Sequence, residues 1–363
     1  MTRVLVVATS RKTRGGITSV VKAHEMGKQW KEYHCKWIET HRDGPAWRKL
    51  WYFVTGCVTF LFFLPFSDLV HIHFSEPPSA IRKILFVYIA KLCHKKVVIH
   101  FHSFSPETTI EGKYKEWYRY LFHKADASIV LSKFWYDAVD KAFHDKEIIS
   151  KVKVIYNPCM LVPRARVNQY QADNENNKIL YAGTLNQRKG YVDLLKGFAK
   201  IAKKYPNWIV EFAGNGEIEK GKVIAKDLGI ENQVHWLGWI EGEEKDRAFC
   251  TATVFCLPSY AEGFPMGVLD AFAYSLPVIT TPVGGIPDVA RDGENMLLFK
   301  PGDVDSLADC LERIMSDDKL RGRMAKESYQ FANGLFSLNN CNRMVAEVYE
   351  TVLNNSTQSK IGS

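Results

Sequence analysis

Short apolar runs recur along the first half of this chain, separated by longer amphipathic stretches. The runs lie at 4–8, 68–74, 97–102, 127–131 and 152–156, and each leads into a polar loop. Runs of this length, apolar on both faces, are typical of buried parallel strands, and the stretches between them have helical periodicity. The pattern predicts an α/β domain in which strands and helices alternate.

A second series of the same kind fills the rest of the chain. Strands are predicted at 178–182, 208–213, 233–238, 253–257 and 277–280. Between the two series, residues 161–177 have no periodicity and end in polar residues, which is typical of a linker. The expected organisation is a first Rossmann-like domain over 1–160, a linker over 161–177, a second Rossmann-like domain over 178–335, a helix over 336–353 that packs back on the first domain, and a polar tail over 354–363.

Length and composition fit this division. The 363 residues suit two domains of ordinary size, and 46% hydrophobic with 24% charged residues is the composition of a globular protein. Eight cysteines are scattered without a CxxC pair, which favours free thiols in a reducing compartment. The chain starts with a predicted strand and not with a leader-like segment, so we expect a cytoplasmic protein.

The charge is concentrated in the first half. Residues 1–160 contain 25 Lys and Arg against 14 Asp and Glu, a formal charge of +11, and the remainder carries −3. A basic domain suits nucleic acid or an anionic membrane surface. Aromatic stacking platforms interleaved with the basic residues are not apparent, so no nucleic acid partner is expected and an anionic membrane surface is favoured.

Residues 51–66 form the most apolar segment. The segment is broken by Gly56, ends near Pro65 and is shorter than the ~20 residues needed to span a bilayer. It is interpreted either as a buried helix of the first domain or as a helix that lies in the membrane interface beside Arg48 and Lys49. The second interpretation places the protein on the inner face of the cytoplasmic membrane.

Two histidine pairs occur in predicted strands, His71 with His73 and His100 with His102. A period of two puts each pair on one face of its strand. Zinc would need a third ligand, and the spacing shows none, so we interpret these residues as hydrogen-bonded strand-end histidines and predict no metal site. Open parallel sheets bind ligands at the carboxyl ends of strands, which makes His102 a candidate for substrate contact.

The stretch from Ser259 to Thr280 predicts a strand, a polar loop, a helix opening at Pro265 and another strand. The first N–H groups of such a helix lack intrahelical partners, so the loop can seat a phosphate. Glu262 in the loop and Asp270 in the helix would be repelled by a bound anion and are better suited to hydroxyl groups of a sugar or ribose. An ordinary strand–helix–strand unit is the alternative.

Two further loops have the character of phosphate-binding turns, and a third contains two glycines. Gly15 and Gly16 follow the first strand, Gly183 precedes Arg188 and Lys189, and Gly214 and Gly216 follow a later strand. Two cations after a strand can neutralise a diphosphate, Arg by bidentate contact and Lys as a point charge. Each loop alone is weak, because a tight turn or a solvated basic loop has the same sequence.

In this order and spacing the motifs resemble glycosyltransferase family 4, the retaining nucleotide-sugar enzymes of the GT-B architecture. The resemblance covers residues 3–350 and is densest over 178–300. It implies two Rossmann-like domains with parallel sheets facing across a cleft, the first binding acceptor and the second donor. It also implies a nucleotide sugar as donor and no dependence on a metal. We expect a UDP- or GDP-linked donor and no other cofactor. The basic first domain beside residues 51–66 favours a saccharide or lipid-linked saccharide acceptor in cell-surface polysaccharide assembly.

The resemblance also implies roles for individual residues. Glu262 would lie near the donor sugar, Lys189 and Arg188 would stabilise the departing diphosphate, and His102 would lie near the reacting sugar. Donor binding would involve Gly15, Gly16, Gly183, Gly214, Gly216, Gly263, Phe264, Pro265, Met266, Gly267 and Asp270.

Two positions depart from the family pattern. Asp270 stands where relatives carry the longer Glu, and Thr184 follows Gly183 where many carry Arg. The alternatives to a glycosyltransferase are a nucleotide-sugar 2-epimerase of the same architecture, which needs no acceptor, and a non-enzymatic protein that binds membrane or nucleic acid.

Overall fold

The computed structural model describes residues 2–162 and 177–361. It divides the chain into two compact units, Met1–Pro158 with Leu338–Ser363, and Cys159–Ser337. Most of the predicted linker lies outside the described residues.

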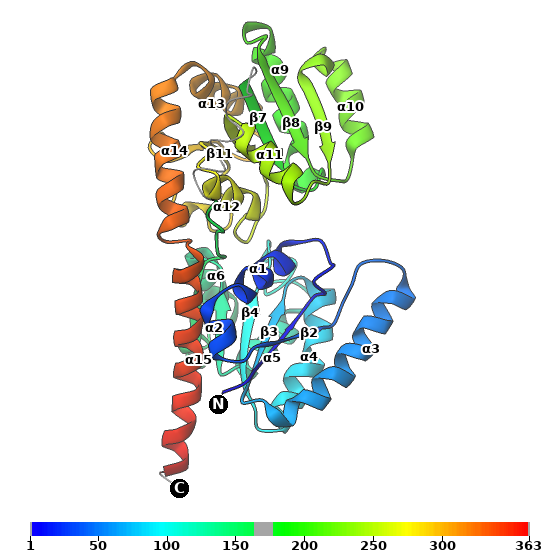
Figure 1. Ribbon diagram of the computed structural model, residues 1–363, viewed down its shortest axis with the longest axis vertical. Helices are drawn as coiled ribbons and strands as arrows, with labels where there is room; N and C mark the ends of the chain where they lie inside the picture. Colours follow the sequence, from blue (N-terminus) through cyan, green and yellow to red (C-terminus); the bar gives the residue numbers. More distant parts are fainter. Residues whose placement is uncertain (1, 163–176, 362–363) are drawn as a thin grey trace. The chain divides into compact units, whose positions relative to one another are not determined.

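Unit 1 is built on a parallel six-stranded sheet in the order β2-β1-β3-β4-β5-β6 (Figure 1). Its strands are β1 (Val4–Ala8), β2 (Lys36–Glu39), β3 (Leu69–Phe74), β4 (Lys96–Phe101), β5 (Ala127–Val130) and β6 (Val152–Val154). Its helices are α1 (Gly16–Glu25), α2 (Lys28–Glu32), α3 (Ala46–Phe63), α4 (Pro77–Leu92), α5 (Lys115–Lys124), α6 (Lys133–Phe143), α7 (Lys146–Ser150) and α15 (Leu338–Ile361).

Both faces of this sheet are covered. Leu5 and Val7 of β1 belong to one buried cluster, and Val4 and Val6 belong to another that includes Val345 of α15. Helix α15 therefore completes the hydrophobic core of unit 1, although it follows unit 2 in the sequence. This helix continues to Ile361, so the predicted polar tail is helical over most of its length.

Unit 2 repeats the architecture with the strand order β12-β11-β10-β7-β8-β9, again parallel. Its strands are β7 (Asn177–Ala182), β8 (Trp208–Ala213), β9 (Val234–Gly238), β10 (Val254–Leu257), β11 (Val278–Thr280) and β12 (Leu297–Leu298). Its helices are α9 (Tyr191–Ile201), α10 (Ile218–Asp227), α11 (Glu243–Thr251), α12 (Met266–Ala273), α13 (Val304–Ser316) and α14 (Asp318–Asn333).

Helix α3 departs from the expectation of a buried helix. It begins at Ala46, earlier than the apolar segment, and within it only Gly56 and Phe60 are buried. Among the described residues, the 21-residue segment Ala46–Phe66 is the one helical segment long and apolar enough to cross a membrane, a test that core helices of soluble proteins also pass. Most of its apolar side chains are exposed, although Phe60 belongs to the core of unit 1 and Phe53, Cys57 and Phe63 pack against that core.

Candidate functional site

The glycines of two loops in unit 2 let these loops pack against each other. The N–H of Gly183 donates to the carbonyl of Ala213 at 2.9 Å. A Cβ on Gly214 would lie 1.8 Å from the carbonyl oxygen of Gly183, and one on Gly216 would lie 2.3 Å from that of Leu185. These positions exclude a side chain because backbone passes against backbone there. The loops after β7 and β8 consequently form one surface at the carboxyl end of the sheet.

Arg188 and Lys189 lie in a short 3-10 turn after β7. The side chain of Asn186 caps this turn by accepting from the N–H of Lys189 at 3.0 Å. The turn ends at Gly190, whose φ of 69° lies in the left-handed region, and a Cβ there would lie 1.9 Å from the carbonyl oxygen of Pro258. The turn therefore packs closely against the loop that follows β10. The role of Asn186 as the cap of this turn was not predicted from the sequence motif.

Glu262 joins the two loops. Its buried carboxylate forms an ion pair with the Lys189 ammonium, accepts from Ser259 Oγ at 2.8 Å, and has Arg188 Nη1 at 3.5 Å. Arg188 Nη1 also donates to the carbonyl of Ala261 at 2.6 Å. The structure thus brings together three of the four predicted catalytic residues, two cations around one carboxylate. The cluster has a formal excess of one positive charge, which suits an anionic ligand.

The segment Gly263–Gly267 leads into α12, whose N-terminus has no side-chain cap. Phe264 is buried and packs on Phe336 with ring centroids 4.9 Å apart. A Cβ on Gly267 would lie 2.8 Å from the carbonyl oxygen of Ala182, and the N–H of Gly285 donates to the carbonyl of Gly263 at 2.8 Å. Phe264 and Gly267 therefore serve packing. Pro265 has no N–H, so the uncapped start of α12 offers the N–H groups of Met266 and Gly267 to an anion.

Asp270 makes an ion pair that the sequence did not predict. Its carboxylate lies 2.8 Å from Lys245 Nζ of α11. A ribose hydroxyl would share this carboxylate with Lys245 or displace it. The ion pair adds Lys245 to the candidate donor site.

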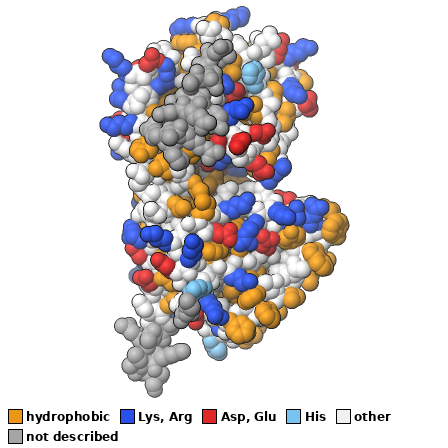
Figure 2. Space-filling view, in the orientation of Figure 1, with side chains coloured by type: hydrophobic (Ala, Val, Ile, Leu, Met, Phe, Trp, Pro, Cys, Tyr) orange, Lys and Arg blue, Asp and Glu red, His pale blue; other side chains and the backbone are white. Residues whose placement is uncertain are grey.

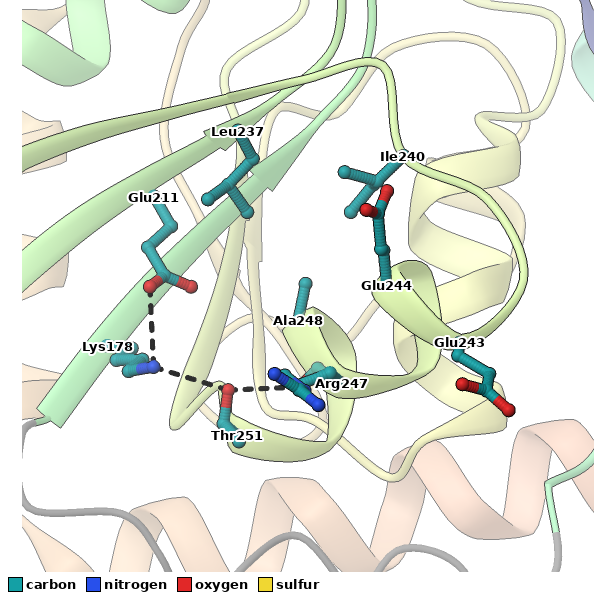
Figure 3. Close-up of a pocket in the computed structure, with 9 residues that line it drawn as sticks. All are labelled: Lys178, Glu211, Leu237, Ile240, Glu243, Glu244, Arg247, Ala248 and Thr251. Carbon is teal, nitrogen blue, oxygen red and sulfur yellow. Dashed lines mark hydrogen bonds and ion pairs between the residues drawn. The ribbon is translucent and has the colours of Figure 1, made fainter.

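Unit 2 also has a cavity of about 460 Å³ between α11 and the sheet (Figure 3). It is lined by Lys178, Glu211, Leu237, Ile240, Glu243, Glu244, Arg247, Ala248 and Thr251. Lys178 Nζ lies 3.3 Å from Glu211 and within hydrogen-bonding distance of Thr251. None of the predicted site residues lines this cavity, and Lys178 and Thr251 lie at the opposite end of the sheet from Lys189 and Glu262. We do not assign it to the donor site.

Unit 1 holds the remaining predicted residues. Gly15 has a φ of 144°, caps α1 and has nothing within 4 Å of the position of a Cβ, and Gly16 is the first residue of the helix. His102 follows β4, donates its N–H to the carbonyl of Phe74 at 2.8 Å, and its Nε2 lies 2.9 Å from His73 Nδ1. Burial, with a further contribution from His24, lowers the pKa of His102 to about 3, so its imidazole is neutral at pH 7.

Comparison with known proteins finds similarity to glycosyltransferases. Residues 164–331 match the family model of the glycosyl transferases group 1. The chain is 32% identical over 190 residues to an uncharacterised glycosyltransferase of Haemophilus influenzae, covering 51% of this chain and 50% of the relative. It is also 32% identical over 162 residues to the lipopolysaccharide core biosynthesis glycosyltransferase LpsE of Rhizobium meliloti, covering 44% and 45%. The chain spans about half the length of these curated relatives.

A solved structure gives the same fold. The crystal structure of Anabaena HepE in complex with UDP-glucose superposes with a TM-score of 0.77 at 17% sequence identity, covering 97% of this chain and 100% of that one. Together with the two parallel six-stranded sheets, this likeness confirms the predicted GT-B fold. The family match over residues 164–331 agrees with the family resemblance predicted from the sequence.

Proposed function

We propose that this chain is a retaining glycosyltransferase, because residues 164–331 match the family model of the glycosyl transferases group 1. It moves a sugar from a nucleotide diphosphate sugar to a saccharide acceptor. The observation that carries the proposal is the cluster of Lys189, Arg188 and Glu262 at the carboxyl end of the unit 2 sheet.

The cluster supports a role in departure of the diphosphate. Lys189 has donors beyond the one given to Glu262, and Arg188 offers a guanidinium fork whose geometry matches phosphate oxygens. The start of α12 adds backbone N–H groups and the positive end of the helix dipole. Fixed donors of this kind stabilise the charge that develops on a leaving group, which is worth about 3–4 kcal/mol for a single donor in a water-excluded site.

The reaction needs no protein nucleophile. The acceptor hydroxyl forms the new bond to the anomeric carbon on the face from which the diphosphate oxygen departs, and its proton passes to that oxygen. Glu262 orients Lys189 and contacts the donor sugar, and Asp270 holds ribose hydroxyls.

The donor and acceptor classes are drawn from similar proteins. HepE binds UDP-glucose, which favours a uridine diphosphate sugar over the GDP-linked alternative. LpsE belongs to lipopolysaccharide core biosynthesis, which supports a lipid-linked saccharide acceptor in cell-surface polysaccharide assembly.

The exposed face of α3 supports a position at a membrane surface. Trp47, Trp51, Val54 and Val58 are spaced by three or four residues and are all exposed, so they form one apolar stripe. Figure 2 shows hydrophobic side chains gathered over this edge of unit 1 with Lys and Arg nearby. We propose that this stripe lies in the interface of an anionic membrane and brings the enzyme to its acceptor.

The test begins with the donor. Thermal shift with UDP, GDP and ADP identifies the base, since a ligand that binds the folded state raises Tm. Release of nucleoside diphosphate from the matching sugar nucleotides is then measured with and without a lipid-linked saccharide extract. Release that depends on the extract supports transfer, whereas epimerised sugar nucleotide formed without it supports the epimerase alternative.

Variants locate the site. Glu262→Ala and Lys189→Ala should each lower turnover at least about 100-fold, because each removes a partner of the leaving-group cluster. Glu219→Ala and Lys222→Ala, which break an exposed ion pair on α10, are the matched controls and should leave turnover unchanged. Near-normal turnover in both site variants would refute the proposed site.

A further inference from the structure

Three buried histidines meet on one face of the unit 1 sheet. Parallel pairing of β3 with β4 places His73 beside His100, and His71 lies two residues earlier on the same strand face. The ring centroids are 4.4 Å apart for His71 and His73, 4.8 Å for His73 and His100, and 5.4 Å for His71 and His100. One ring nitrogen from each residue lies within 4.8 Å of the other two. We propose that His71, His73 and His100 form a binding site for a divalent transition metal ion of the zinc class.

In two of these rings, the Nδ1 atom already takes part in a hydrogen bond. His71 Nδ1 lies 2.6 Å from the hydroxyl of Tyr349, and His73 Nδ1 lies 2.9 Å from His102 Nε2. Histidines that bind metals usually donate one ring N–H to an outer partner and present the other nitrogen to the ion. The arrangement therefore leaves Nε2 of His71 and of His73 for a ligand.

Further nitrogens point to the same conclusion. Among the described residues, His71 Nε2 and both ring nitrogens of His100 are buried without a hydrogen-bond partner. Nearby His24 has the same arrangement, with Nδ1 2.5 Å from Asn342 Oδ1 and Nε2 unpartnered, and its ring centroid lies 6.2 Å from that of His100. Buried polar atoms in folded proteins are almost always satisfied. A metal cation coordinated by the lone pairs of these nitrogens would satisfy several of the buried polar atoms at once.

The donor set indicates the class of ion. Imidazole nitrogens suit zinc, copper, nickel and iron, whereas magnesium and calcium prefer carboxylate and carbonyl oxygens. Burial, reinforced by the neighbouring histidines, lowers the pKa of all three imidazoles well below its ordinary value, so they are neutral ligands at pH 7.

Binding requires a small closure of the site. Zinc–nitrogen bonds of about 2.0–2.1 Å in a tetrahedral site bring the nitrogens to roughly 3.3 Å from one another. The rings of His73 and its two neighbours are inclined by 34° and 30°, so they must turn further about their Cβ–Cγ bonds for the lone pairs to converge. A water or His24 Nε2 would complete the coordination. This site is separate from the donor cluster and does not depend on the proposed function.

The experiment uses the full chain carrying a cleavable tag without histidines. The protein is loaded with zinc, dialysed, and analysed for metal by mass spectrometry, and a cobalt-loaded sample is examined for the visible absorption of a tetrahedral site. We expect about one ion per chain, and we expect loading to raise Tm by about 5 °C or more, reversed by dipicolinate.

His100→Leu is the ligand variant, because it removes no hydrogen bond seen among the described residues and is therefore expected to fold. His123→Gln, at an exposed histidine of α5, is the control. His100→Leu should lose the ion and the cobalt band, and His123→Gln should keep both. Less than about a tenth of an ion per wild-type chain after loading, or equal metal in the two variants, would overturn the proposal.

Discussion

At the scale of single residues, the backbone conformation of Gly190 fixes the position of Lys189. Its left-handed φ closes the 3-10 turn, and the carbonyl of Pro258 occupies the space where a Cβ would lie. The position of Lys189, which we propose to stabilise the leaving group, thus depends on the neighbouring Gly190.

A matched pair of glycines tests this dependence. Gly229 has the same φ of 69° but nothing within 4 Å of a Cβ. Gly229→Ala should lower the free energy of unfolding by about 1–2 kcal/mol, the cost of the left-handed backbone alone. Gly190→Ala should lower it further and reduce kcat/KM at least about tenfold, because the clash moves the turn. If Gly190→Ala and Gly229→Ala had equal effects on the free energy of unfolding and on kcat/KM, the clash at residue 190 would be relieved without moving Lys189.

Lys83 gives a second prediction at this scale. It is 2% exposed, donates to Thr40 Oγ1, and burial lowers its pKa well below the ordinary 10.5. Below pH 10.5 the unfolded chain binds a proton at Lys83, whereas the folded protein disfavours that proton. The contribution of Lys83 to the free energy of unfolding therefore increases with pH up to about 10.5. Lys83→Met should stabilise the protein, and the gain should grow as the pH falls from 10 to 7.

Denaturant unfolding at pH 7, 8.5 and 10 measures that gain. Thr40 Oγ1 still donates to the carbonyl of Ala8 in the variant, so no polar group is stranded. Lys124→Met, at an exposed lysine of α5, is the control and should show no such trend. A gain for Lys83→Met that does not change with pH would contradict a buried neutral amine.

At the scale of elements, most strands could be predicted because long apolar runs mark them. The strands β1, β3, β4 and β8 coincide closely with such runs. Strand β2 was missed, since Lys36–Glu39 has only two buried residues, and β12 has only two residues in all. The sequence pattern also did not predict the break between α14, which ends at Asn333, and α15, which begins at Leu338. Short edge strands and helix breaks carry too few patterned positions to be recognised.

The prediction at the scale of elements concerns membrane binding by helix α3. Val58→Glu places a charge in the middle of the apolar stripe, and Val223→Glu places the same charge on α10 of unit 2. The two valines are 63% and 60% exposed, so neither change disturbs a core. Val58→Glu should weaken binding to vesicles containing phosphatidylserine about tenfold or more, because a carboxylate would enter the interface of an anionic bilayer.

Flotation at low salt measures this binding. Val223→Glu should float like the wild type, and both should dissociate as salt increases, since basic residues contribute to the attraction. If the wild type does not float, or if the two variants float equally, α3 does not contact the membrane.

At the scale of the whole molecule, long-range pairing creates what the sequence could not show. Lys189 and Glu262 are 73 residues apart and meet because β7 and β10 are neighbours in the sheet. Strand pairing also brings His100 of β4 beside His73 of β3. His100 is thus the third ligand of the proposed zinc site, which residue spacing within one strand could not reveal. Residue types and their local loops could be predicted from motifs, but contacts such as that between Asp270 and Lys245 could not.

The division into two units predicts how the molecule unfolds. Units of this size with separate cores should melt in two calorimetric transitions. Val345 of α15 is buried in the unit 1 core with Leu69 and Val98, so Val345→Asp should lower the unit 1 transition strongly, as burying an unpaired charge does. Thr351→Asp, exposed on the same helix, should have little effect.

Nucleotide binding is expected to affect the two transitions differently. Arg188, Lys189, Glu262 and Asp270 all lie in unit 2. The nucleoside diphosphate chosen by thermal shift should therefore raise the unit 2 transition by the same amount in wild type and in Val345→Asp, because binding stabilises only the unit that holds the ligand. If Val345→Asp abolished that shift, essential donor contacts would belong to unit 1, and the loop at Gly16 would be the first place to look. A preserved shift with lost sugar transfer would assign donor binding to unit 2 and leave the acceptor to unit 1.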